Sequence, residues 1–162
     1  MPFEFEKKLY MIYGFNPYRV LEVNTDTGVC TEITNDSHAV TWNYGEVRGG
    51  TPAIDYNESE FIHFFHSSKD FTFPSGLTKK VYFAGAMTFS KSIPFKPKRM
   101  IEHPIMDSSY YDQENPGLFI FPTGIIKEDK YFHLFMGKND SHMIRSKIYF
   151  DTLETYLKDI DF

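Results

Sequence analysis

Short runs of apolar and aromatic residues recur along the chain, and turn-forming residues separate each run from the next. These runs fall into three groups, at about residues 1–35, 50–105 and 117–150. The run Tyr18–Val23 is typical, because its β-branched and aromatic residues suit a pleated, half-buried surface. Thr27-Gly28, which follows it, supplies the positive φ that a tight hairpin needs. The pattern predicts an all-β protein of short antiparallel strands.

The three groups share a rhythm. Each opens with a proline near the start of a strand, at Pro2, Pro52 and Pro122, which are 50 and 70 residues apart. A charged turn and an aromatic strand come next in each group. Spacings of this size are typical of repeat architectures such as propeller blades. We therefore expect a partial, about three-bladed β-propeller of four-stranded antiparallel sheets.

Three sheets are too few to close a propeller, which usually has about 4 to 8 blades. An open set of blades leaves sheet faces and end strands unprotected. The sequence therefore leaves three alternatives open: part of a larger assembly, a truncated relative of a propeller, or a β-sandwich. We treat residues 1–162 as a single domain whose blade-like units are the three groups described above.

The end of the chain differs, because its apolar positions follow the spacing of a helix. Asp151 can cap a helix, and Glu154 lies three residues later, in capping-box position. Positions i, i+3, i+4 and i+7 then form one apolar face, made of Leu153, Tyr156, Leu157 and Ile160. We expect a short amphipathic helix at about residues 151–160, packed on a sheet.

Composition narrows the class of protein. Hydrophobic residues make up 41% of the chain and aromatic residues 18%, which is typical of a folded, strand-rich protein rather than a disordered one. The formal net charge is −5, and acidic and basic residues are mixed along the chain. Because there is no basic stripe, we expect no nucleic-acid partner.

The cysteine count and the N-terminal residues bear on the cellular compartment of the protein. Cys30 is the single cysteine, so no intrachain disulfide can form, which suits a reducing compartment. The N-terminal residues carry early acids and no long apolar run, unlike a signal peptide. No stretch approaches the roughly 20 apolar residues of a membrane helix. We expect a soluble cytoplasmic protein, which could be virus-encoded, with no membrane partner.

A series of glycine- and proline-containing motifs runs through the second and third groups. In chain order they are Arg48-Gly49-Gly50-Thr51-Pro52-Ala53-Ile54, Phe64-Phe65-His66-Ser67-Ser68, Tyr82-Phe83-Ala84-Gly85-Ala86, His103-Pro104-Ile105-Met106, Gly117-Leu118-Phe119-Ile120-Phe121-Pro122-Thr123-Gly124 and Phe135-Met136-Gly137-Lys138-Asn139-Asp140. Such residues also serve as turn punctuation in any β protein.

In order and spacing, this series resembles the C-terminal blades of the β-mannoside phosphorylase and mannosylglucose phosphorylase-like glycosidase family. The family's pattern is G-x-P-P-I, a strand ending Y-H-G, Y-x-x-G-A, P-I-L, V-F-P-x-G and Y-Y-G-x-x-D, followed by a short helix. The resemblance covers about residues 45–160, and residues 1–35 look like the preceding blade. It implies a five-bladed propeller fold, of which this chain would be the C-terminal part.

The resemblance implies an activity on mannose-type glycosides by phosphorolysis, hydrolysis or transfer. Such chemistry needs a carboxylic acid to protonate the leaving oxygen. The family's general acid is an aspartate upstream of the matched blades, and this sequence has no corresponding position. We therefore expect a truncated carbohydrate-active protein, and whether it is an enzyme stays open. The alternative is a catalytically inactive glycan-binding or assembly module.

The matched positions give candidate binding residues. Asp140 corresponds to the aspartate of Y-Y-G-x-x-D, which the resemblance assigns to sugar hydroxyls. His66 corresponds to the histidine of Y-H-G, a candidate donor to sugar or phosphate. Arg48 lies near the family's basic residue and is a candidate for substrate and phosphate, and Lys80 is a weaker phosphate candidate. Each also has an ordinary explanation, as a turn, strand-end or loop residue.

One departure from the family concerns phosphate. Where the phosphorylases often carry arginine in Y-R-x-G-A, this chain has Phe83, so a guanidinium is lost. Aromatic residues that could stack on sugar faces are Phe83, Trp42, Tyr44, Tyr110 and Tyr111, although ordinary core or loop packing is the simpler explanation for each. We expect no cofactor and no metal, with inorganic phosphate as an optional co-substrate. The expected partners are carbohydrate, a second copy of the chain, or an N-terminal chain that completes the propeller.

Overall fold

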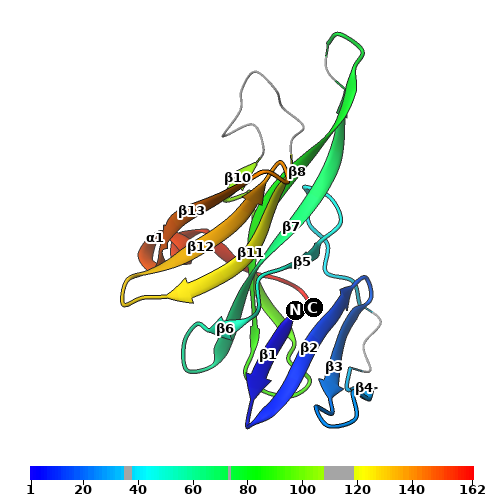
Figure 1. The fold of residues 1–162 in the computed structure, drawn as a ribbon, viewed down its shortest axis with the longest axis vertical. Helices are drawn as coiled ribbons and strands as arrows, with labels where there is room; N and C mark the ends of the chain where they lie inside the picture. The colour runs from blue at the N-terminus through cyan, green and yellow to red at the C-terminus, as the bar shows by residue number, and fades with distance from the viewer. Residues whose placement is uncertain (35–37, 73, 108–118) are drawn as a thin grey trace.

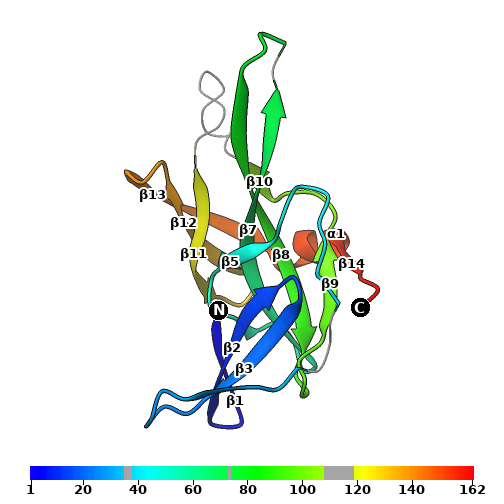
Figure 2. The ribbon, with the colours of Figure 1, turned by 90° about the vertical axis from the view of Figure 1, so that its right-hand side faces the viewer.

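The structure, a computed structural model, describes residues 1–34, 38–72, 74–107 and 119–162. The all-β prediction is confirmed: these residues form antiparallel sheets and one short helix near the C-terminus (Figures 1 and 2). Three sheets are formed in chain order, with four, seven and three strands. This arrangement is consistent with the partial propeller and with the sandwich that the sequence left open.

The N-terminal sheet has its strands in sequence order, β1-β2-β3-β4. Their bounds are β1 Pro2–Phe5, β2 Lys8–Phe15, β3 Tyr18–Val23 and β4 Cys30–Glu32. Two-residue turns connect β1 to β2 and β2 to β3, and residues 24–29 connect β3 to β4. Residues on β2 alternate between buried and partly exposed, so one face of this sheet packs inward and the other does not.

The central sheet follows the order β14-β9-β8-β7-β5, with β6 paired to β7 and β10 paired to β8. Its strands are β5 Arg48–Gly50, β6 Ile54–Asp55, β7 Glu60–Thr72, β8 Thr78–Ser90, β9 Pro97–Ile101, β10 Met106–Asp107 and β14 Leu157–Asp159. Strands β7 and β8 pair over their whole length and extend beyond the other strands as a long hairpin (Figure 1). The sequence pattern had predicted shorter strands here.

The C-terminal sheet has the order β11-β12-β13. Its strands are β11 Ile120–Lys127, β12 Tyr131–Lys138 and β13 His142–Tyr149. A β-bulge between Pro122 and Gly124 shifts the register of β11 against β12. Such a bulge bends and twists a strand, which fits its place at a sheet edge.

The central sheet has a packed core on each face. On β7, Phe61 and Phe65 point to the N-terminal sheet, while Ile62 and Phe64 point to the C-terminal sheet. All four are buried, because successive side chains of a strand face opposite ways. The three sheets are therefore stacked face to face, with the central sheet in the middle.

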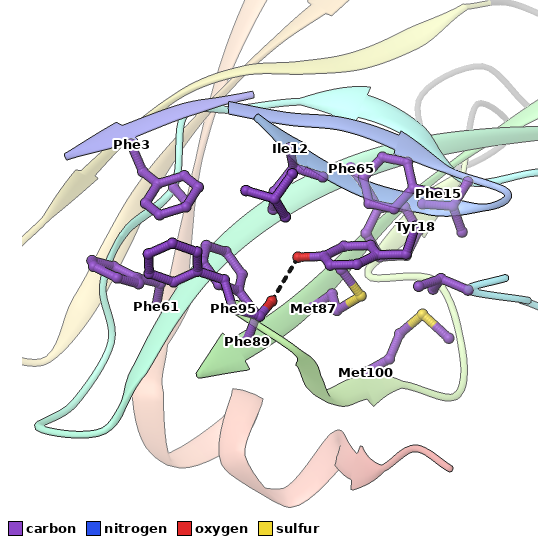
Figure 3. Packing of buried hydrophobic residues seen from close by; sticks show 14 of the residues in the cluster. Phe3, Ile12, Phe15, Tyr18, Phe61, Phe65, Met87, Phe89, Phe95 and Met100 are labelled. Carbon is purple, nitrogen blue, oxygen red and sulfur yellow. Dashed lines mark hydrogen bonds between the residues drawn. The ribbon is translucent and has the colours of Figure 1, made fainter. Parts of the chain in front are cut away.

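Aromatic rings dominate the core between the N-terminal and central sheets (Figure 3). The Phe3 ring, from β1, lies 5.0 Å from the ring of Phe89 and 4.9 Å from that of Phe95. The buried hydroxyl of Tyr18 donates a hydrogen bond of 2.9 Å to the carbonyl of Phe95. Burial without a hydroxyl partner would be costly, so this bond lets a polar ring fill an apolar core.

The first strand of each sheet lies at the line where the three sheets meet. β1, β5 and β11 are each an edge strand of their sheet. Residues of β5 and β11 are in contact, and the amide of Ala53, just after β5, donates to the carbonyl of Pro2 in β1 at 3.1 Å. The sheets therefore fan out from a common line formed by their first strands.

The helix at the C-terminus is shorter than predicted. α1 spans Phe150–Tyr156, and the residues after it form β14, which pairs with β9. Leu157 is extended and buried, because it pairs with Ile101 at the edge of the central sheet. The expectation of a helix to about residue 160 was wrong, because the extended chain buries Leu157 and pairs with the free edge of β9.

The predicted capping box is also wrong. Tyr149 is the N-cap residue, and no side chain caps the helix. The Glu154 carboxylate instead accepts hydrogen bonds from Arg99 of β9 and from the hydroxyl of Tyr56. Arg99 also contacts Glu60 at 2.7 Å, and both of these side chains are largely shielded from solvent. This network fixes the helix to the central sheet.

In the described part of the chain, no helix has the length and apolar character needed to cross a membrane.

Candidate functional site

The sequence-predicted residues Arg48 and His66 lie together at one end of the molecule. They are direct partners in the ladder between β5 and β7. The His66 ring also makes an edge contact with the ring of Phe121 in β11, with centroids 4.6 Å apart. This end is where β5 and β11, two of the converging strands, begin.

Half-exposed aromatic rings gather beside His66. We call Tyr82, Phe119 and Phe121 the ring platform. The Tyr82 ring lies 4.8 Å from Phe119 and 5.2 Å from Phe121, and Phe119 and Phe121 stack at 6.0 Å. Phe119 keeps 39% of its surface exposed. Clustered, accessible rings beside polar groups are suited to an amphipathic ligand with an apolar face.

His66 is oriented by the backbone of β5. Its Nδ1–H donates a hydrogen bond to the carbonyl of Gly49, which leaves Nε2 as the acceptor of the neutral ring. Burial lowers the pKa of His66, with the Arg48 charge acting in the same direction and the Gly49 hydrogen bond opposing it. His66 is therefore neutral at pH 7 and offers Nε2 to a hydroxyl donor.

Arg48 is exposed at the start of β5. Its guanidinium contacts the carboxylate of Glu46 at 3.3 Å, and both side chains are more than half exposed. An exposed pair of this kind contributes little free energy, so the guanidinium is available to another anion.

Asp140 lies in the turn between β12 and β13. Asn139 and Asp140 both have positive φ, and the amide of Ser141 donates to the carbonyl of Lys138 at 3.2 Å. These features define a type I′ turn, where Asn and Asp are favoured. The carboxylate of Asp140 is exposed.

This turn lies beside the ring platform. The amide of Asn139 donates to the carbonyl of Phe119 at 3.1 Å. The side-chain oxygen Oδ1 of Asn139 is shielded from solvent and has no hydrogen-bond partner among the described residues. Asp140 and His66 are thus at the same end of the molecule, on either side of Phe119 and Phe121.

Lys80 lies further out on the long hairpin. It pairs with Asp70, and alternation along β8 places it on the same face as Tyr82. His66, Tyr82 and Lys80 therefore share one face of the hairpin, in that order toward its tip. The Lys80 side chain is exposed.

The aromatic residues named as sugar-stacking candidates lie elsewhere. Phe83 is buried on the opposite face of β8, where its ring contacts Tyr44 at 5.1 Å. Trp42 donates from its indole N–H to the carbonyl of Ile101 at 2.9 Å and packs edge-on against Phe65. Tyr110 and Tyr111 lie outside the described residues.

Tyr82 was not among the residues named from the sequence, and strand alternation is the signal that could have identified it. His66 was recognised, and the residue on β8 that shares its face is Tyr82, not its neighbour Phe83. The pairing register of β7 with β8 was needed to see this, because a shift of one residue exchanges the two faces. Phe119 and Phe121 belong to the motif at residues 117–124, which supports the family resemblance but does not identify either ring as a ligand contact.

Two histidines on β7 have different environments. His63 is completely buried among aromatic rings, and neither ring nitrogen has a hydrogen-bond partner among the described residues. It points to the opposite face from His66, as strand alternation requires. No cluster of three or more metal-ligating side chains occurs in the described ranges.

One solved structure has a fold similar to that of this chain. No protein-family model and no curated protein matches the chain. The crystal structure of a glycosyl hydrolase from Bacteroides ovatus at 2.30 Å resolution is similar, with a TM-score of 0.59 over 92% of this chain. The fold is therefore glycosidase-like. The two sequences are 18% identical, so the likeness concerns the fold. The chain spans 44% of the length of that hydrolase.

Proposed function

We propose that this protein binds carbohydrate at the ring platform, with His66, Arg48 and Asp140 as polar partners. The observation that carries the proposal is the juxtaposition of the accessible rings of Tyr82, Phe119 and Phe121 with an oriented, neutral imidazole. Sugars present apolar C–H faces and a rim of hydroxyls. Rings of this kind pack on the apolar face, and Nε2 and the carboxylate accept hydrogen bonds from hydroxyls.

The sugar class in the proposal is a β-mannoside. It is supported by the ordered motif series and by the fold likeness to a glycosyl hydrolase.

Binding is tested by titrating the whole chain with β-mannosides while following ligand signals by saturation-transfer NMR. Tyr82→Ala is expected to lower affinity three- to tenfold, since a ring contact contributes about 0.5–1.5 kcal/mol. Phe71→Ala is the matched control, because Phe71 is an exposed ring on the opposite face of the same hairpin. Equal losses in the two variants, or no binding by the unaltered chain, would refute the proposal.

A second candidate function is turnover of the same sugars, with phosphate or water as acceptor. It is motivated by the resemblance of the motif series to a phosphorylase family. The reaction needs a carboxylic acid to protonate the leaving oxygen, and this chain has no counterpart of the family's acid. Chromatographic assay of mannose and mannose phosphate, with and without phosphate, decides between binding and turnover.

A further inference from the structure

Two outer sheet faces of this structure are apolar without belonging to either core. On the C-terminal sheet, Phe132, Leu134 and Met136 of β12 point into the core. The alternate residues therefore point away from the central sheet. With their cross-strand neighbours they form what we call the C face: Ile126, Tyr131, His133, Phe135, Met143, Arg145, Lys147 and Tyr149. Met143 is 75% exposed and Ile126 52% exposed.

The N-terminal sheet has a matching surface. Tyr10 and Ile12 of β2 point into the core, so Leu9 and Met11 point outward. Cross-strand neighbours and the bulged Tyr13 extend this surface, which we call the N face: Glu4, Leu9, Met11, Tyr13, Arg19, Leu21 and Glu32. Tyr13 is 61% exposed. Contiguous apolar surface of this kind on a soluble domain is typical of an interaction site.

The two faces complement each other in charge. The charged residues that β12 and β13 contribute to the C face are Arg145 and Lys147. The N face carries Glu4, Glu32 and Arg19, and Arg19 pairs with Glu32 at 2.6 Å and lies over the Tyr13 ring. The C face is therefore basic and the N face slightly acidic, a pattern that favours contact between unlike faces over contact between like faces.

The arrangement of the sheets indicates how the faces meet. Within the chain, each sheet already packs its face on the next, and β1, β5 and β11 converge on one line. A second copy rotated about that line would continue the same stacking order, C face on N face. Two copies would supply six sheets, which falls within the about 4 to 8 blades of closed propellers.

We propose that the chain forms a head-to-tail dimer in which the C face of each copy packs on the N face of the other. This arrangement covers both apolar surfaces at once and leaves no open sheet face. It is a closed cyclic assembly with two identical heterologous contacts. Phe121 of the ring platform is in register with Gly137 and Met143 at one edge of the C face. The assembly is tested by mass and the sugar proposal by ligand titration, so failure of one is distinguishable from failure of the other.

Sedimentation equilibrium of the unaltered chain tests the assembly. The expected mass is twice the chain mass of 19.0 kDa. Higher salt is expected to shift the equilibrium toward monomer, because part of the attraction is between exposed charges. A monomer at the highest soluble concentration overturns the proposal, and growth beyond the dimer overturns the closed arrangement.

Paired variants test which faces meet. Met143→Asp alters the C face and Tyr13→Asp the N face, and both positions are exposed, so folding is expected to survive, as circular dichroism will check. Each variant alone is expected to be monomeric. Leu77→Asp, at an exposed apolar position near the hairpin tip, is the control and is expected to remain dimeric.

Mixing the two variants distinguishes a head-to-tail dimer from a dimer in which like faces meet. In a head-to-tail dimer, a mixed pair has one contact with both substitutions and one intact contact, so dimer is expected to reappear on mixing. In a dimer of like faces, only one of the two variants would dissociate, and mixing would restore nothing. That outcome overturns the head-to-tail arrangement.

Discussion

His66 and Arg48 face each other across the ladder between β5 and β7, and the imidazole is held by the carbonyl of Gly49, the residue that follows Arg48 in β5. This relationship gives the two side chains different roles. The imidazole is oriented and neutral, whereas the guanidinium is exposed and charged. The two are therefore separable by substitution.

His66→Ala is expected to weaken binding of an uncharged β-mannoside about three- to tenfold, since a single hydrogen bond contributes about 0.5–1.5 kcal/mol. His103→Ala, at a histidine on the other side of the sheet that bonds to Tyr44, is the control and should change affinity less than twofold. Isothermal titration calorimetry measures both. Equal affinity of His66→Ala and the unaltered chain would remove His66 from the site.

The binding should also depend on pH in a defined direction. Because the pKa of His66 is lowered, Nε2 stays an acceptor at neutral pH and becomes protonated only as pH falls through that lowered value. Affinity is therefore expected to be constant above neutrality and to decrease in acid. The His66→Ala variant should lack this decrease, whereas a decrease of equal size in the variant would assign it to another group.

Arg48→Gln is expected to affect anions selectively. The exposed ion pair with Glu46 holds the guanidinium weakly, so phosphate can compete for it. We expect phosphate affinity, followed by ³¹P NMR, to fall several-fold, and affinity for an uncharged sugar to fall less, because glutamine keeps hydrogen-bond donors for hydroxyls but loses the charge. Lys98→Gln, at an exposed lysine on β9, controls for the change in net charge. An equal effect of the two substitutions on phosphate would show only a general charge effect.

The sequence predicted the strands better than it predicted the face on which each side chain lies. The apolar run Tyr18–Val23, set off by turn residues, has the bounds of β3, because this strand lies in a sheet with one buried face and short connections. Phe83 and Tyr82 are adjacent on β8, and the face of each depends on long-range pairing with β7, so the sequence alone did not show that Phe83 is buried and Tyr82 is half-exposed. β14 was read as helix because Leu157 and Ile160 suit both an apolar helix face and a buried edge strand.

Buried His63 is expected to make the fold sensitive to acid. Burial lowers the pKa of His63 to about 3, from 6.5 for an exposed imidazole. Between these values the unfolded chain binds a proton and the folded chain does not, so stability decreases as pH falls from 6.5 toward 3. At pH 5 the loss from this residue is about 2 kcal/mol relative to neutral pH.

His63→Met replaces the imidazole with an apolar side chain that adapts to irregular gaps. Urea unfolding at pH 7 and pH 5 is expected to show a smaller loss of stability for this variant than for the unaltered chain. His142→Met, at an exposed histidine in β13, should leave the pH dependence unchanged. The same pH dependence in all three proteins would assign the acid sensitivity to other groups.

Gly85 shows that one glycine of the motif series has a packing role. It pairs with Phe65, and a Cβ at Gly85 would lie 2.3 Å from the Phe65 ring. That ring is fully buried and held edge-on by Trp42, so it has little room to move. Gly85→Ala is expected to cost about 1–3 kcal/mol of unfolding free energy, as overpacking of a core does.

The control is Gly137→Ala, where a Cβ meets no atom within 4 Å and stability should change by less than about 0.5 kcal/mol. If the two variants were equally stable in urea, the glycine of Tyr82-Phe83-Ala84-Gly85-Ala86 would need an explanation other than the approach of Phe65.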